Sequence, residues 1–125
     1  MRENRASRTA ERIAMCRARE SSRPESERIC NDPYAKYFLP WQYHLVARIP
    51  FLIQYLRKKG RERVPGVLEA VAARVRYFDD YLDQCVLKGT VHQVVILGAG
   101  YDSRAYRMER LQNGIQVFEV DHPAT

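Results

Sequence analysis

Two apolar runs near the end of the chain constrain its fold more than any other feature. Residues 94–97 form a β-branched run that leads into the turn Gly98-Ala-Gly100. Residues 116–120 form a second run that leads into Asp121, which lies 21 positions after Gly100. A strand, a glycine-bearing turn and an acid at the end of the next strand are typical of a βαβ nucleotide site. The spacing therefore predicts parallel strands whose turn and carboxylate face a single ligand.

The glycine turn carries the first part of this prediction. Gly98 and Gly100 have no Cβ, so a ligand can approach the backbone closely and φ can be positive. A short helix is expected to follow, capped by Asp102 or Ser103 and ending at about Leu111. The free N–H groups at the start of that helix would favour an oxygen-rich ligand. A tight strand-to-helix turn without a ligand is the alternative interpretation.

The residues around the turn also discriminate between nucleotides. A dinucleotide site requires a third glycine at position 103, where this chain has Ser103. Asp102 beside it would repel a pyrophosphate, whereas it would not repel the cationic sulfonium and ammonium groups of S-adenosylmethionine. The electrostatics therefore favour S-adenosylmethionine over NAD as the cofactor.

Two charged side chains are candidates for direct contact with that cofactor. Asp121 ends the second strand and can accept both hydroxyl hydrogens of a ribose, and we prefer it to Glu119, which lies deeper on the same face. Arg74 lies at the edge of the apolar stripe of a long helix, while Arg76 falls on the solvent side. A guanidinium beside a core needs an anionic partner, and a cofactor carboxylate matches its fork. The alternatives are an arginine that extends its charged end to solvent, or a structural pair between Arg74 and Asp102.

The rest of the chain is expected to be mostly helical. Apolar residues at helical spacing, from Val67 to Val86, predict a long helix that opens at Pro65-Gly66 and ends before Gly89. Two β-strands are expected over residues 93–97 and 115–120. Shorter elements precede them: a disordered stretch at 1–7, a helix at 9–19 with Thr9 as its cap, a short helix at 34–39, a helix at 41–56 that bends at Pro50, and an exposed connector at 58–61.

Composition excludes several other classes of protein. The net charge is +6, but the arginines of residues 2–28 alternate with glutamates and have no aromatic neighbours, so we expect no nucleic-acid partner. The three cysteines and three histidines lack metal-ligand spacing, so no metal is expected. An odd number of widely spaced cysteines indicates reduced thiols, and no signal peptide or membrane-spanning run is visible, so a cytoplasmic location without a membrane partner is expected.

The combination of motifs is similar to that of a known family. Leu97-Gly-Ala-Gly-Tyr-Asp-Ser-Arg104 followed by Phe118-Glu-Val-Asp-His-Pro123 resembles the leucine carboxyl methyltransferase family, and most closely its bacterial branch of S-adenosylmethionine-dependent O-methyltransferases. The likeness extends over nearly the whole chain through Thr9-Ala10, Arg17-Ala18, Arg28-Ile-Cys-Asn-Asp-Pro-Tyr-Ala35, Phe38-Leu39, Arg74, Asp79 and Asp80.

The resemblance implies a fold, a cofactor and a set of binding residues. The fold is α/β, with a helical extension over residues 1–89 and the beginning of a Rossmann-like class I methyltransferase sheet over residues 90–125, which is incomplete because later strands are absent. The reaction is methyl transfer to an oxygen of a carboxylate or another small-molecule acceptor, and no catalytic residue can be named. The implied cofactor-binding residues are Arg74, Gly98, Ala99, Gly100, Tyr101 and Asp121.

Two other hypotheses remain open at this point. The chain could be a truncated, non-catalytic module that pairs its open sheet edge with a second copy of itself, because a two-stranded parallel sheet has little stability alone. It could instead be a fragment of an NAD(P)-binding Rossmann protein. As an isolated chain, we expect it to bind the cofactor weakly and to be inactive.

Overall fold

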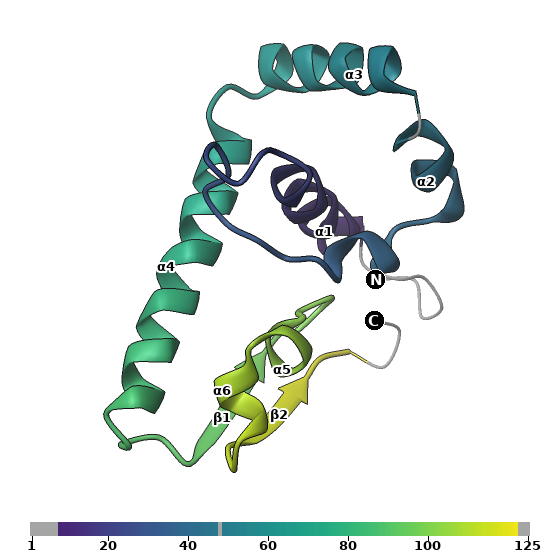
Figure 1. The fold of residues 1–125 in the computed structure, drawn as a ribbon. Helices are drawn as coiled ribbons and strands as arrows, with labels where there is room; N and C mark the ends of the chain where they lie inside the picture. Colours follow the sequence, from purple (N-terminus) through teal and green to yellow (C-terminus); the bar gives the residue numbers. More distant parts are fainter. Residues whose placement is uncertain (1–7, 48, 123–125) are drawn as a thin grey trace.

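The computed structural model describes residues 8–47 and 49–122, which form helices and a small two-stranded parallel sheet (Figure 1). The disorder predicted for residues 1–7 therefore lies outside the described residues. In chain order the elements are α1 (Arg8–Ser21), the 3₁₀ helix η1 (Ala35–Phe38), α2 (Trp41–Ala47), α3 (Pro50–Arg63), α4 (Val67–Leu87), β1 (Gln93–Leu97), α5 (Arg104–Arg107), α6 (Glu109–Gln112) and β2 (Gln116–Val120).

Helix α4 is the long helix that the apolar spacing predicts. It follows Gly66, whose φ is 77°, and ends at Leu87, two residues before Gly89, whose φ is 67°, a left-handed conformation that glycine adopts without a Cβ clash. The helix buries Val71 and Val75 of the predicted stripe. Its neighbours are α1, which packs along its first half, and α6, which touches its second half (Figure 1).

The sheet also agrees with the prediction. Strands β1 and β2 are parallel and in register from Gln93 opposite Gln116 to Leu97 opposite Val120. Because side chains alternate along a strand, Val95, Leu97, Phe118 and Val120 share one face, and all four are exposed. Within the described residues, this apolar face of the sheet has no helix packed over it.

The helical region differs from the prediction at three places. Pro50 separates two helices, α2 and α3, instead of bending one, because proline lacks the N–H that a continuous helix needs and is well suited to a first helical turn. The expected connector at 58–61 belongs to α3, which continues to Arg63. Thr9 lies inside α1, which already begins at Arg8, so it is not the cap of that helix.

The helices between the two strands are also shorter than expected. Instead of one helix reaching Leu111, α5 and α6 are single turns separated at Met108, whose backbone is extended. Ser103 precedes α5 without forming a side-chain cap, whereas Asp102 Oδ1 accepts the N–H of Arg104 at 2.8 Å. The free N–H groups that were expected to attract a ligand are therefore reduced by the chain's own carboxylate.

Over residues 8–47 and 49–122, no helix combines the length and the apolar character that a bilayer span requires.

Candidate functional site

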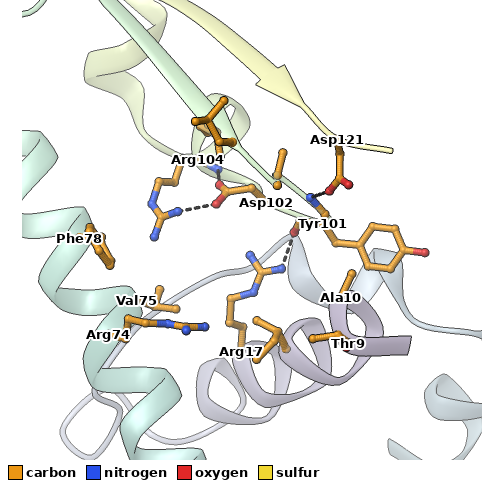
Figure 2. Close-up of a pocket in the computed structure, with 16 residues that line it drawn as sticks. Thr9, Ala10, Arg17, Arg74, Val75, Phe78, Tyr101, Asp102, Arg104 and Asp121 are labelled. Carbon is orange, nitrogen blue, oxygen red and sulfur yellow. Dashed lines mark hydrogen bonds and ion pairs between the residues drawn. The ribbon is translucent and has the colours of Figure 1, made fainter. Parts of the chain in front are cut away.

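An open cavity of about 480 Å³ lies where α1 and α4 meet the ends of the strands (Figure 2). Its volume falls within the range of small-molecule sites. The structure brings to this cavity all six residues that the sequence singled out, although they come from α4, the turn after β1 and the end of β2. They are Arg74, Gly98, Ala99, Gly100, Tyr101 and Asp121.

The backbone of the glycine turn is held by the end of the neighbouring strand. The N–H groups of Gly98 and Ala99 both donate to the carbonyl of Val120, at 2.8 and 3.2 Å. Gly98 and Gly100 have φ values of 63° and 56°, which side chains with a Cβ rarely adopt. A Cβ on Gly100 would lie 3.2 Å from the Cβ of Ala10 in α1. The turn therefore needs glycine for its conformation, and at Gly100 also for the close approach of α1.

Asp121 faces this turn, as Figure 2 shows. Its Oδ2 accepts a hydrogen bond from the N–H of Gly100, and its Oδ1 accepts one from the N–H of His122 at 2.6 Å. A carboxylate has about four acceptor sites, so an exposed Asp121 keeps capacity for two further donors such as ribose hydroxyls. Glu119 does not line the cavity. Its pKa is raised above the usual value, first by partial burial and then by the charge of Asp102.

Arg74 extends from α4 into the cavity, beside Val75 and Phe78 (Figure 2). Among residues 8–47 and 49–122 the structure shows no ion pair or hydrogen bond to its guanidinium, so the alternative of a pair with Asp102 is not observed. Arg76 lies on the outer side of the same helix, where its Nε donates to Asp80 at 2.7 Å. One turn of α4 thus presents an exposed, paired arginine and another arginine whose charge faces the cavity.

Arg17 is a cavity residue that the sequence analysis did not single out. It is 5 % exposed, and its Nη1 donates to Asp32 Oδ2 at 2.8 Å. Its Nη2 donates to the carbonyl of Tyr101 in the glycine turn (Figure 2). Burial lowers the pKa of Arg17, and the charge of Asp32 opposes this effect. The available signal was Arg17 at helical spacing from Ile13 and Ala14, on the side of α1 that contributes its buried residues.

A cluster of ion pairs supports the turn from behind. Arg104 donates to Asp102 and, at 2.8 Å, to Asp79, while Arg107 donates to the other oxygen of Asp79 at 2.7 Å. Arg104 and Arg107 therefore act as structural supports of the turn. Because Arg104 balances the charge of Asp102, the repulsion of a pyrophosphate that the sequence analysis assigned to Asp102 is weaker than expected.

The tyrosines contribute less to the cavity than their number suggests. The ring of Tyr101 stacks on Phe38, with ring centroids 5.3 Å apart, so the contribution of this residue to the turn is largely that of its backbone. Tyr77 packs against Phe78 and Tyr81, and Tyr106 lies near Tyr34. Neither Tyr77 nor Tyr106 lines the cavity. Both tyrosines are exposed, and their rings contact other aromatic rings.

The chemistry available in the cavity is that of binding. Within the part of the chain that the structure describes, no group of three histidine, cysteine or acidic side chains is arranged to hold a metal ion. Asp121 offers acceptors for hydroxyl groups, Arg74 offers a donor fork for a carboxylate, and the glycine turn allows close approach to the backbone between them. These groups suit a ligand with a sugar at one end and an anionic group at the other.

Comparison with known proteins agrees with this arrangement. The chain is 35% identical over 122 residues to a protein of Mycolicibacterium paratuberculosis named "Putative S-adenosyl-L-methionine-dependent methyltransferase". Proteins with the same name from Mycobacteroides abscessus and Saccharopolyspora erythraea are 34% and 33% identical. Each alignment covers 92% of this chain but only 35% to 37% of the relative, so the chain spans little more than a third of their length.

The family model described as leucine carboxyl methyltransferase matches residues 10–125, which include α1, the glycine turn and Asp121. The resemblance found in the sequence is therefore confirmed, and the chain belongs to the leucine carboxyl methyltransferase family.

Proposed function

We propose that this chain forms the cofactor-binding part of an S-adenosylmethionine-dependent methyltransferase. The observation that carries the proposal is the hydrogen bond between Gly100 and Asp121, which lies across one cavity from the guanidinium of Arg74, a group without an ion-pair partner among the described side chains. S-adenosylmethionine, when bound, would supply a methyl group on a sulfonium; an acceptor nucleophile would attack the methyl carbon in line, and the sulfur would leave as the thioether of S-adenosylhomocysteine. The residues of this chain bind and orient the cofactor, and we assign none of them an acid or base role.

The cavity fits the two polar ends of that cofactor. Asp121 would accept hydrogen bonds from the ribose hydroxyls, because two of its acceptor sites remain after Gly100 and His122 are satisfied. Arg74 would hold the methionine carboxylate, because its charge faces the cavity without a partner among the described side chains. The turn 98–101 would lie against the methionine part. An added Cβ at Gly98 would have no neighbouring atom of the described chain within 4 Å, so the space beside it is open to a ligand.

The finer assignments follow from family membership. We propose O-methylation, of a carboxylate or another small-molecule acceptor, as the reaction of the whole protein. Residues 1–89 would serve as a helical cap over the cofactor and residues 90–125 as the first part of its Rossmann-like domain. Further strands, from a C-terminal part or a second copy of the chain, would extend the sheet at its open edges, and further elements would pack over its exposed apolar face, which includes Leu97 and Val120.

Calorimetry with two ligands tests the proposed contacts one at a time. S-adenosylhomocysteine has both ribose and carboxylate, whereas 5′-methylthioadenosine lacks the amino acid end. Asp121→Ala should weaken the binding of both ligands by about 10- to 100-fold, since each loses hydrogen bonds to a charged acceptor. Arg74→Met should weaken S-adenosylhomocysteine by about tenfold and leave 5′-methylthioadenosine unchanged.

Glu119→Gln is the matched control for Asp121→Ala, and Arg76→Met is the matched control for Arg74→Met. Each control residue lies two positions from the residue under test and does not line the cavity. Both variants should bind the two ligands as the wild type does. Equal affinities of wild type and Asp121→Ala for S-adenosylhomocysteine would remove Asp121 from the site. Binding of NADH, with no binding of S-adenosylhomocysteine, would support a dinucleotide site instead; the pairing of Asp102 with Arg104 makes this comparison necessary.

A further inference from the structure

Arg17, a buried side chain of helix α1, links this helix to the glycine turn. One terminal nitrogen of its guanidinium binds Asp32 and the other binds the carbonyl of Tyr101, 84 positions further along the chain. Its Nε has no hydrogen-bond partner in the described structure. The two terminal nitrogens of this side chain therefore join the turn before η1 to the glycine turn.

Asp32 is held as firmly as the arginine it meets. Its side chain is fully buried, and its Oδ1 accepts the N–H groups of Tyr34 and Ala35 at 3.1 and 3.0 Å. Its own N–H donates to the hydroxyl of Ser21, which in turn donates to the carbonyl of Arg17 at 2.8 Å. The turn before η1 and the last turns of α1 thus form a closed set of hydrogen bonds, from which Arg17 reaches the glycine turn.

The far end of this connection is the segment that would touch the cofactor. Tyr101 directly follows Gly100, whose N–H binds Asp121, and the N–H of Asp102 donates to Ala99 at 2.9 Å. A shift of the Tyr101 carbonyl would therefore move the same peptide units that set the distance between the turn and Asp121. Since a guanidinium presents its donors in a rigid plane, it fixes that carbonyl more closely than a flexible ammonium would.

We propose that Arg17 is a positioning residue, which holds the glycine turn at the correct place relative to Asp121 through the Tyr101 carbonyl, with Asp32 fixing the guanidinium. Binding of the cofactor and docking of α1 are then coupled, because α1 supplies the bond that orders the turn. The role of Arg17 in cofactor binding rests on the proposed function. The ordering of the turn by Arg17 can be measured without any ligand.

Amide hydrogen exchange of residues 98–102 in the ligand-free protein is the direct test. Arg17→Lys keeps the charge opposite Asp32 but replaces two terminal nitrogens by one, and Arg17→Gln removes the charge. Both variants should speed exchange at 98–102 by about tenfold or more, as expected for the loss of a hydrogen bond to a charged donor. The amides of residues 80–87, at the end of α4, should be unchanged in Arg17→Lys. Arg12→Gln, on the exposed side of α1, is the matched control and should exchange like the wild type.

The outcomes separate a positioning role from a merely structural one. If Arg17→Lys exchanges at 98–102 like the wild type, or if its exchange rises equally over 80–87, the proposal is overturned. Should Arg17→Gln fail to fold, Arg17→Lys still decides the matter. Calorimetry with S-adenosylhomocysteine should then show about tenfold weaker binding to Arg17→Lys. If the wild type does not bind this ligand, the proposed function fails while the exchange result stands on its own.

Discussion

The two walls of the cavity differ in the kind of bond that builds them. The wall at the end of the sheet is held largely through its backbone: the glycine turn bonds to the carbonyl of Val120, and the N–H of Gly100 donates to Asp121. The wall formed by α1 is made from side chains, and its Arg17 is paired at 2.8 Å with Asp32, which lies behind the wall in a buried environment. Both walls present polar groups to the same cavity.

This difference indicates which substitutions each wall tolerates. A wall built from backbone depends on φ values, so it is sensitive at glycines and insensitive to most other side chains. A wall built from a buried ion pair depends on both partners, because removing one of them leaves the other charged and desolvated. The following predictions test that contrast, and they run from the largest expected effect to the smallest.

Asp32→Ala should cause the largest loss of stability. It leaves Arg17 buried without its carboxylate and removes the acceptor of two backbone N–H groups, those of Tyr34 and Ala35. We expect the free energy of unfolding to fall by about 3–5 kcal/mol, measured by urea denaturation. Asp80→Ala is the control, since Asp80 pairs with Arg76 on the exposed side of α4 and should cost less than about 1 kcal/mol. Equal losses in the two variants would show that the buried ion pair contributes no more to stability than the exposed one.

Gly100→Ala should have a smaller effect on stability and a larger one on binding. Its φ of 56° strains any residue with a Cβ by about 1–2 kcal/mol, and the new Cβ would lie 3.2 Å from Ala10 and 3.8 Å from Asp121 Oδ2. Gly114→Ala, at a φ of 89° with nothing within 4 Å, carries the same kind of strain away from the cavity. Both variants should lose stability in urea, but only Gly100→Ala should lose affinity for S-adenosylhomocysteine. Unchanged affinity of Gly100→Ala for S-adenosylhomocysteine would show that the glycine turn does not contact the ligand.

The backbone wall could be predicted from the sequence because its signals are local. The apolar run 93–97, the glycines and the acid after the second strand lie within 30 residues of one another, and each has a direct physical meaning. Both strands, the parallel pairing and the closeness of Gly100 to Asp121 are therefore as predicted. Arg74 in the cavity could also be predicted, because its angle on α4 follows from helical periodicity.

The side-chain wall could not be predicted in the same way. Whether an arginine is buried depends on which carboxylate the fold brings to it, and Asp32 lies 15 positions from Arg17 while Tyr101 lies 84 positions away. Neither separation produces a periodic signal. The helix boundaries at Pro50 and Met108 also differ from the prediction. Pro50 begins a new helix because it lacks the N–H that a continuous helix needs, and Met108 separates α5 from α6 with an extended backbone.

The smallest expected effect concerns Cys30, which packs with Ala72 and Val75 behind the side-chain wall. Burial, assisted by the charge of Glu20, raises the pKa of its thiol from 9.0 to about 11. A raised pKa means that the unfolded chain ionises first, so the stabilisation from the neutral thiol is complete below pH 9 and is lost as the pH rises to about 11. At pH 10 the wild type should have lost about 1 kcal/mol more than Cys30→Ala, each relative to its own stability at pH 8, as measured by urea denaturation. If the stability of the wild type and that of Cys30→Ala change with pH in the same way, the thiol is in contact with water. The packing of the side-chain wall would then be looser than the structure shows.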